Sequence, residues 1–329
     1  MKILYCVQLT GNGHVTRANE LIPEFKKVAK VDVLTSGNQS SLEIKEKVNF
    51  KFRGLSFVFG SRGGVDIFKT IHNLRPFTFI KDVFNLQVKN YDLIINDFEP
   101  VSAWACKFRG VPCYSMSRQF SLLQKNSFNK VKPKLYEFLI LKYFAPSING
   151  IGFDYKKNNS NNFYPIIKSD IKRKKVINKN HYTIYLPSFS IENIINFFSS
   201  LDEVIWHVFS PKINKPFKKE NLSFFPTDYK VFEQSILSCK GIVSNAGFET
   251  TSEALYLDKK LLIIPMKNQF EQQYNASILS NIGIKILLDL KQKRLGTVKE
   301  WILSEKSVKG NYDYNYKSII EKTLLDFNK

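Results

Sequence analysis

The stretch SNAGFETTSEALYLDKKLLIIPMKNQFEQQYNA, residues Ser244 to Ala276, reads as a strand end, a glycine turn, a helix start, a second strand and a polar loop. Gly247 has no Cβ, so its backbone can come close to a ligand. Thr250, Thr251 and Ser252 place hydroxyls beside the backbone N–H groups of a helix N-terminus. Because such a helix end attracts anions, the stretch predicts a site for a diphosphate.

Acidic and amide side chains of the same stretch suggest contacts to sugar hydroxyls. Glu253 could accept hydrogen bonds from a ribose diol, as acidic residues do in dinucleotide-binding folds. Alternatively, it is a first-turn acid that interacts favourably with the helix dipole. After the strand LLIIP, Asn268 and Gln269 are followed by Glu271 and Gln272, which suit the hydroxyls of a sugar. The alternative for this loop is a solvated connection.

A second glycine-containing loop, GNGHVTR, lies near the N-terminus between a short apolar strand and a helical pattern. Gly11 and Gly13 let the backbone turn sharply and approach a ligand. His14 then lies at the helix start, where an imidazole can take a proton from a hydroxyl near neutral pH. On its own the loop is more typical of a tight turn with a capping or core histidine.

Asp97 follows the apolar segment DLIIN, which reads as a buried strand. Ligands of open parallel sheets bind beyond the carboxyl ends of the strands. Asp97 could therefore orient His14 or contact an acceptor. The alternative is a cap on the following turn.

Strand-like and helix-like segments alternate in two series, which predicts an α/β protein with two Rossmann-like domains. A basic zone between Lys125 and Lys179, with thirteen Lys or Arg against three acidic residues, indicates the boundary. We expect domains at residues 1–170 and 171–329, with a last helix over Tyr316 to Phe327 that could pack back on the first domain. The first series comprises Ile3–Val7, Val15–Lys30, Val31–Leu34, Phe50–Phe59, Val65–Val88 and Asp92–Asn96, with Ile148–Phe153 completing the sheet. The second comprises segments from Tyr182, Val204–Phe209, Leu222–Phe225, GIVSN and KLLIIP.

The formal net charge is +20, from 49 Lys and Arg against 29 Asp and Glu. Attraction to anionic partners explains it as well as the codon bias of an AT-rich genome does. Four cysteines without CxxC pairs predict neither a zinc site nor a disulfide framework. The segment Leu135 to Phe144 fits a helix with its apolar face on the core, or else a membrane-surface element. No nucleic-acid-binding motif occurs, and the absence of a long apolar run predicts a cytoplasmic protein.

The C-terminal stretch resembles the GT-B superfamily of glycosyltransferases, including UDP-glycosyltransferases, the peptidoglycan-precursor N-acetylglucosaminyltransferase and transferases of the teichoic-acid-biosynthesis type. That signature is a glycine turn, a hydroxyl pair, a glutamate, a proline, an acidic residue with glutamine, and Asn-Ala. This chain supplies them in order as Gly247, Thr250-Thr251, Glu253, Pro265, Glu271-Gln272 and Asn275-Ala276. The N-terminal match is shorter and rests on GNGH and Asp97.

The resemblance implies a GT-B architecture, with two parallel sheets facing each other across a cleft. It implies an acceptor-side N-terminal domain and a C-terminal domain that binds a nucleotide sugar, with no other cofactor and no metal. The implied roles are general base for His14, orientation or acceptor contact for Asp97, and donor binding for Gly13, Asn245, Gly247, Thr250, Thr251, Glu253, Glu271 and Gln272. Asn245 departs from the plant-type pattern, in which a histidine often contacts the phosphate.

The implied reaction is an inverting, metal-independent transfer from a UDP-sugar to a hydroxyl acceptor, in cell-surface glycan or glycolipid synthesis. The expected partners are a nucleotide sugar, a carbohydrate or lipid-linked acceptor and, through the basic zone of residues 125–179, an anionic surface on the inner face of a membrane. Acceptor specificity is expected from Gly60–Asp66 and Arg118–Gln124. The alternative is a UDP-sugar hydrolase or epimerase of the same fold, since GNGHVTR also resembles the GxGHxxR loop of a UDP-sugar hydrolase.

Overall fold

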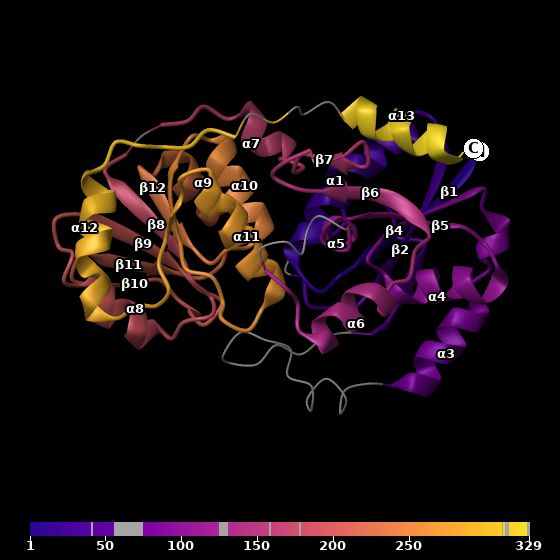
Figure 1. Ribbon diagram of the computed structural model, residues 1–329, viewed down its shortest axis with the longest axis horizontal. Helices are drawn as coiled ribbons and strands as arrows, with labels where there is room; N and C mark the ends of the chain where they lie inside the picture. Colours follow the sequence, from indigo (N-terminus) through magenta and orange to yellow (C-terminus); the bar gives the residue numbers. More distant parts are fainter. Residues whose placement is uncertain are drawn as a thin grey trace. The chain divides into compact units, whose positions relative to one another are not determined.

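The computed structural model describes residues 1–40, 42–55, 75–124, 131–157, 159–177, 179–310, 312 and 316–327. Four predictions reach outside these ranges: the end of the strand Phe50–Phe59, the first part of the helix Val65–Val88, the acceptor loop Gly60–Asp66 and parts of the basic zone of residues 125–179. The described chain divides into two compact units, the first holding the described residues up to Lys168 together with the C-terminal helix, the second residues 169–312 (Figure 1).

The first unit contains a parallel sheet, in which the described residues form seven strands in the order β3-β2-β1-β4-β5-β6-β7. Its order reverses between β1 and β4, as in doubly wound α/β folds, and the crevice at such a switch point lies beyond the carboxyl ends of the strands. The strands are β1 Lys2–Gln8, β2 Lys30–Ser36, β3 Phe50–Phe52, β4 Leu93–Asp97, β5 Cys113–Ser117, β6 Asn149–Phe153 and β7 Asn162–Phe163.

Helices connect these strands because apolar residues recur at helical spacing between them. In the helix after β1, Leu21, Ile22 and Phe25 are fully buried. The helix after β4 begins at Pro100, where the buried carboxylate of Glu99 accepts hydrogen bonds from two backbone N–H groups. The described helices are α1 Asn12–Lys26, α3 Pro76–Asn85, η1 Val88–Asn90, α4 Pro100–Arg109, α5 Arg118–Leu122, α6 Leu135–Tyr143 and α13 Tyr316–Phe327.

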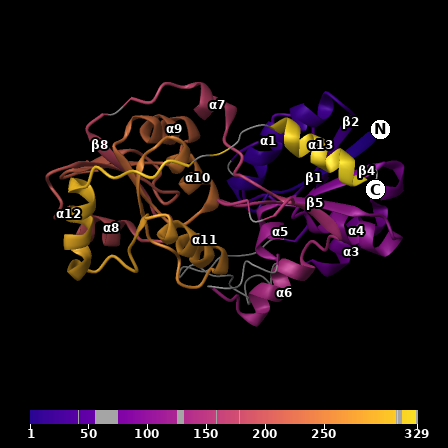
Figure 2. The ribbon, with the colours of Figure 1, turned by 45° about the horizontal axis from the view of Figure 1, so that its top comes forward.

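The C-terminal helix α13 packs on the first unit, against α1 (Figure 2) and β6 (Figure 1). Tyr114 in β5 donates a 2.8 Å hydrogen bond to Asp326, and Tyr316 donates one of 2.6 Å to the carbonyl of Ile167. Ile319 and Ile320 of α13 are buried. The last segment of the chain is therefore a structural part of the unit formed by the first half.

The second unit repeats this plan, with described strands in the order β10-β11-β9-β8-β12-β13-β14 and all pairings parallel except β10 with β11. Its core is rich in aromatic side chains, among them Trp206, Phe197 and Phe198. The strands are β8 His181–Tyr185, β9 Ile205–Phe209, β10 Phe217–Lys219, β11 Leu222–Phe225, β12 Gly241–Ser244, β13 Lys260–Ile263 and β14 Lys285–Ile286. The helices are α7 Ser169–Arg173, α8 Ile191–Phe198, α9 Tyr229–Ser238, α10 Phe248–Tyr256, α11 Phe270–Asn281, η2 Gln292–Arg294 and α12 Leu295–Leu303.

One favoured prediction about a helix is met only at its end, where Phe144, the last residue of the predicted segment, is buried against Phe98. Helix α6 forms at the expected place, but none of its residues is buried, and Leu135 and Leu139 remain 75% and 43% exposed. Its apolar residues are spread around the helix instead of along one face, so that no single stripe can dock on the sheet. Among the described residues, no helix is both long enough and apolar enough to cross a membrane.

Candidate functional site

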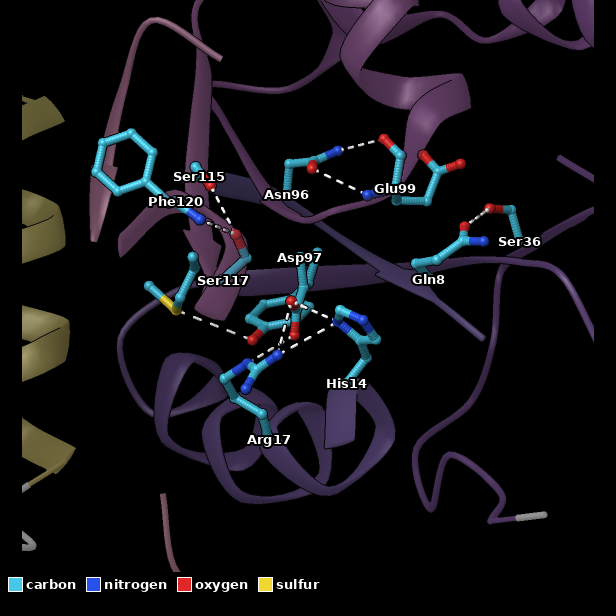
Figure 3. Close-up of polar contacts among 12 residues, drawn as sticks. Gln8, His14, Arg17, Ser36, Asn96, Asp97, Glu99, Ser115, Ser117 and Phe120 are labelled. Atoms are coloured by element: carbon cyan, nitrogen blue, oxygen red, sulfur yellow. Dashed lines mark hydrogen bonds and ion pairs between the residues drawn. The ribbon is translucent and has the colours of Figure 1, made fainter. Parts of the chain in front are cut away.

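His14 and Asp97, which are 83 residues apart, meet at the switch point of the first sheet. His14 lies in the first turn of α1, and Asp97 is the last residue of β4. Because β1 and β4 pair in parallel, the start of α1 lies beside the end of β4. Nδ1 of His14 is 2.8 Å from Oδ1 of Asp97 (Figure 3).

Arg17 completes this group, and the sequence had not assigned it a role. Its Nε and Nη2 donate to the two carboxylate oxygens of Asp97 at 2.8 and 2.9 Å, a bidentate contact. Arg17 is one turn beyond His14 on α1, so both side chains point from one helix face toward Asp97 (Figure 3). The GxGHxxR spacing was the signal that could have found it.

Neighbouring charges determine the protonation state of Asp97. Burial alone would raise the pKa of Asp97, but the charges of Arg17 and His14 outweigh it and hold this pKa below its ordinary value. An ionised carboxylate can only accept, so the 2.8 Å contact requires a proton on Nδ1 of His14. No hydrogen bond within the described residues engages Nε2, and this nitrogen is left as the proton acceptor.

Neighbouring polar side chains hold the same edge of the sheet together (Figure 3). Asn96 donates to the carbonyl of Glu99 at 2.6 Å, and Ser36 donates to Gln8 at 2.7 Å. Burial raises the pKa of Glu99 even though its carboxylate accepts bonds from the backbone N–H groups of Val101 and Ser102. These contacts are internal to the fold, and they brace the ends of β1, β2 and β4 around Asp97.

The glycine turn of the second unit precedes helix α10. Gly247 is the N-cap of this helix, and no side chain caps it. A Cβ at Gly247 would meet no atom within 4 Å, and the backbone there has φ −70°, which any residue adopts. Space in front of an uncapped helix N-terminus is the geometry of an anion site.

The hydroxyl side chains that follow Gly247 differ in their hydrogen-bond partners. Thr251 is fully buried and donates to the carbonyl of Gly247 at 2.7 Å, while Ser252 donates to the carbonyl of Phe248 at 2.6 Å. Their protons therefore satisfy backbone acceptors of the helix. Thr250 is half-buried, and its hydroxyl bonds to no other described residue. Of the two predicted threonines, Thr250 is the better placed for an external ligand.

Two buried asparagines fix the turn before α10. The amide of Asn245 donates to the carbonyl of Ile264 at 2.6 Å and accepts from Ser188 at 2.9 Å. Asn275, fully buried in α11, donates to the carbonyl of Ala246 at 2.9 Å. The Asn-Ala pair of the sequence signature is thereby given a structural role: it clamps the loop that begins the anion site.

A cavity of about 340 Å³ lies at the carboxyl edge of the second sheet. Lys267 and Asn268 contribute a cation and an amide to its wall, beside Ser188. Gln272 accepts a hydrogen bond from the backbone N–H of Met266 at 3.0 Å, so its carbonyl oxygen shapes this loop. Glu271 is half-buried in the first turn of α11.

The remaining predicted residues lie elsewhere in the two units. Glu253 is buried in α10, near enough to Tyr229 that its charge adds to burial and the Glu233 hydrogen bond in raising the pKa of Tyr229. Gly13 is half-buried in the first turn of α1. Arg118, from the predicted acceptor segment, is buried 3.1 Å from Asp154. Within the described ranges, no three His, Cys, Asp or Glu side chains gather closely enough to hold a metal ion.

Comparisons with known proteins identify a family through one family model and a fold through solved structures. A family model described as "Glycosyl transferase family 1" matches residues 1–303. Similar solved structures include Arabidopsis thaliana UGT89C1 complexed with UDP, with 12% identity, a TM-score of 0.62 and coverage of 98% of this chain and 99% of that one. Acinetobacter baumannii MurG has 11% identity, a TM-score of 0.59 and coverage of 100% and 99%. VinC, in complex with dTDP, has 11% identity, a TM-score of 0.53 and coverage of 100% and 95%. A search of curated proteins gives no match.

Proposed function

Because the chain belongs to glycosyltransferase family 1, we propose that it is an inverting, metal-independent transferase that moves a sugar from a UDP-sugar to a hydroxyl acceptor. The observation that carries the proposal is the buried group of His14, Asp97 and Arg17 at the carboxyl edge of the first sheet. This group supplies a base, Nε2 of His14. Such a base can take the proton of an acceptor alcohol as the alcohol attacks.

In the proposed reaction the acceptor hydroxyl gives its proton to Nε2 of His14 while its oxygen forms a bond to the anomeric carbon. The bond from that carbon to the diphosphate oxygen breaks, and the leaving group takes the electron pair. Asp97 stabilises the imidazolium that forms, since its carboxylate already accepts the Nδ1 proton. Attack from the face opposite the leaving group inverts the anomeric centre.

The second unit is proposed to bind the donor. Negative charge grows on the diphosphate as it leaves, and the N-terminus of α10 with the Thr250 hydroxyl would stabilise that charge. Gly247 permits close approach because its Cβ position is open. Lys267 in the nearby cavity adds a positive charge. Together these groups supply what a metal ion provides in other transferases.

The test is sugar transfer from a panel of nucleotide sugars, assayed in the presence of EDTA, with wild-type protein and the His14→Ala variant. We expect the wild type to remain active in EDTA and the variant to lose at least about 100-fold in turnover, which is the usual contribution of a general base. The affinity for UDP should stay unchanged in the variant. Near-normal turnover without His14 would refute the base assignment.

A hydrolase is the second candidate, favoured by the contact of Arg17, the last residue of the GxGHxxR-like string, with Asp97. In that case His14 would activate water instead of an alcohol. Incubation with a UDP-sugar and no acceptor distinguishes the two, since a hydrolase releases UDP stoichiometrically and a transferase releases it only slowly.

We further propose that the acceptor belongs to cell-surface glycan or glycolipid synthesis and that the enzyme works peripherally on the inner face of a membrane. The net charge of +20 supports this proposal, because anionic lipid surfaces attract basic proteins. If the protein does not bind anionic vesicles even at low salt, this proposal is contradicted.

A further inference from the structure

Helix α3 exposes an apolar stripe. Phe77, Ile80 and Phe84 follow one another at spacings of three and four residues and so share one helix face. They are 87%, 50% and 56% exposed, whereas Val83 on another face is buried. A stripe of this spacing normally lies against a core. Here it faces away from the core of its own unit.

Helix α4 lies beside α3 (Figure 1), and the apolar stripe continues onto it. The rings of Phe84 and Phe108 stack with centroids 5.7 Å apart, and Phe108 is 59% exposed. Trp104 lies one turn earlier on α4, 5.6 Å from Phe108. Exposed apolar surface that is contiguous over two elements marks an interaction site more often than scattered single residues do.

A cavity of about 460 Å³ opens beside the last turn of α4. Val111, Tyr143 and Ile148 give it an apolar wall, and Ile148 is itself 86% exposed. The volume lies within the range of about 300–1,000 Å³ of ligand pockets. The cavity is at the amino edge of the sheet, because β5 starts at Cys113, and so it lies on the opposite edge from Asp97.

Basic residues accompany this apolar surface. Lys107 and Lys142 line the cavity, and Arg75 and Lys81 lie exposed on α3 or just before it. Asp82 is the acid of α3, and α4 contains no acidic residue. A surface that combines exposed apolar side chains with lysine and arginine complements an anionic amphiphile.

We infer that these residues form a lipid-docking face, defined by Phe77, Ile80, Phe84 and Phe108 and the cavity beside Ile148. The face binds an anionic bilayer, with the apolar side chains in the interfacial region and one acyl chain in the cavity. Lys107 and Lys142 contact the phosphate headgroup. The inference rests on the membrane association proposed above and places it on α3, α4 and the part of the basic zone around Lys142 and Ile148.

Co-sedimentation with vesicles of equal parts phosphatidylcholine and phosphatidylglycerol tests the face. Phe77→Ser and Ile148→Ser change side chains that contribute little to the fold, since both are almost fully exposed. We expect the double variant to bind at least about tenfold more weakly, the loss anticipated for removing two apolar anchors. Leu303→Ser is the matched control, because Leu303 is 81% exposed on the second unit and should leave binding unchanged.

The charged residues are tested in the same assay. Lys107→Glu with Lys142→Glu should abolish the preference for phosphatidylglycerol over pure phosphatidylcholine vesicles. Lys218→Glu with Lys219→Glu, the same charge change on the exposed strand β10, should weaken binding far less. Equal effects of the two pairs would mean that net charge alone drives binding, and the docking face would be refuted.

Dodecyl phosphate below its micelle concentration probes the cavity by calorimetric titration. We expect it to bind the wild type, to bind the lysine double variant about tenfold more weakly, and to exceed inorganic phosphate in affinity. Absence of dodecyl phosphate binding overturns the acyl-chain assignment. A wild-type dimer that Phe77→Ser dissociates would instead assign the face to a second copy of the chain. Each result is independent of sugar transfer, which is followed separately with a soluble acceptor.

Discussion

At the residue scale, the site depends on how Arg17 holds Asp97. A guanidinium donates two parallel hydrogen bonds to a carboxylate, and a lysine ammonium cannot reproduce that fork. Arg17→Lys keeps the positive charge but loosens the orientation of Asp97 and, through it, of His14. We expect turnover to fall about 10- to 100-fold while the KM for the donor changes little.

Steady-state kinetics of Arg17→Lys and Arg17→Ala over a range of pH measure this effect. The alanine variant should also shift the acid limb of the profile, because the pKa of Asp97 rises when the guanidinium is removed. Unaltered profiles in folded variants would show that Arg17 serves stability alone.

His14 and Asp97 could be predicted as a pair, whereas the GxGHxxR string could have singled out Arg17 but not its partner. Asp97 ends an apolar strand segment, and His14 follows another one after a short glycine loop. Parallel strands bring such positions to one edge of the sheet. Arg17 lies inside a helix, and its salt bridge to a residue 80 positions away depends on the pairing of β1 with β4. Long-range pairing of this kind is not encoded in local spacing.

A second residue-scale prediction concerns His181 and His207, whose rings stack 4.0 Å apart in the second unit. Burial and the neighbouring His207 lower the pKa of His181 to about 4, and burial also lowers the pKa of His207. The unfolded chain takes up protons below about pH 6.5, whereas the folded unit resists them. Stability should therefore be full above pH 6.5 and fall progressively toward pH 4.

Urea unfolding of the wild type and of His181→Gln between pH 7.5 and 4.5 checks this expectation. The wild-type midpoint should decline over this window, and the variant should decline less. Parallel curves for the two proteins would show that His181 does not govern the pH dependence.

At the scale of elements, helix α13 couples the end of the chain to the first unit. The hydroxyl of Tyr114 donates to the carboxylate of Asp326 across 212 residues. Tyr114→Phe removes this bond without leaving a cavity, and we expect the free energy of unfolding to fall by about 1 kcal/mol. Tyr136→Phe, which removes a hydroxyl with no described partner, is the control and should be neutral. Equal unfolding midpoints for the two variants would mean that the contact does not hold α13.

The positions of strands β1, β4 and β13 could be predicted well, because each is a short, contiguous run of mostly apolar residues. The environment of α6 could not, because its mean composition is apolar and yet no face of it is buried. The hydroxyl of Thr251 was also misleading. Its place at a helix start suggested a ligand contact, but a buried threonine in a helix readily bonds the carbonyl one turn back.

At the scale of the whole molecule, two mostly parallel sheets built on the same plan carry different chemical groups at their carboxyl edges. The first presents His14, and the second presents the open turn at Gly247 and the uncapped start of α10. Two alternating series in the sequence were enough to predict this duplication. Proton transfer belongs to one unit and donor binding to the other in the proposed reaction, so substitutions in the first unit should lower turnover and those in the second should weaken donor binding.

Calorimetric titration of UDP into the wild type and three variants tests this division most directly. Gly247→Ala adds one methyl group where the protein leaves space, so it should fold normally but bind UDP at least about tenfold more weakly by filling the anion site. Gly296→Ala, where an added Cβ also meets nothing within 4 Å, and His14→Ala should both bind like the wild type. Unchanged UDP affinity in Gly247→Ala, or a loss confined to His14→Ala, would contradict donor binding by the second unit.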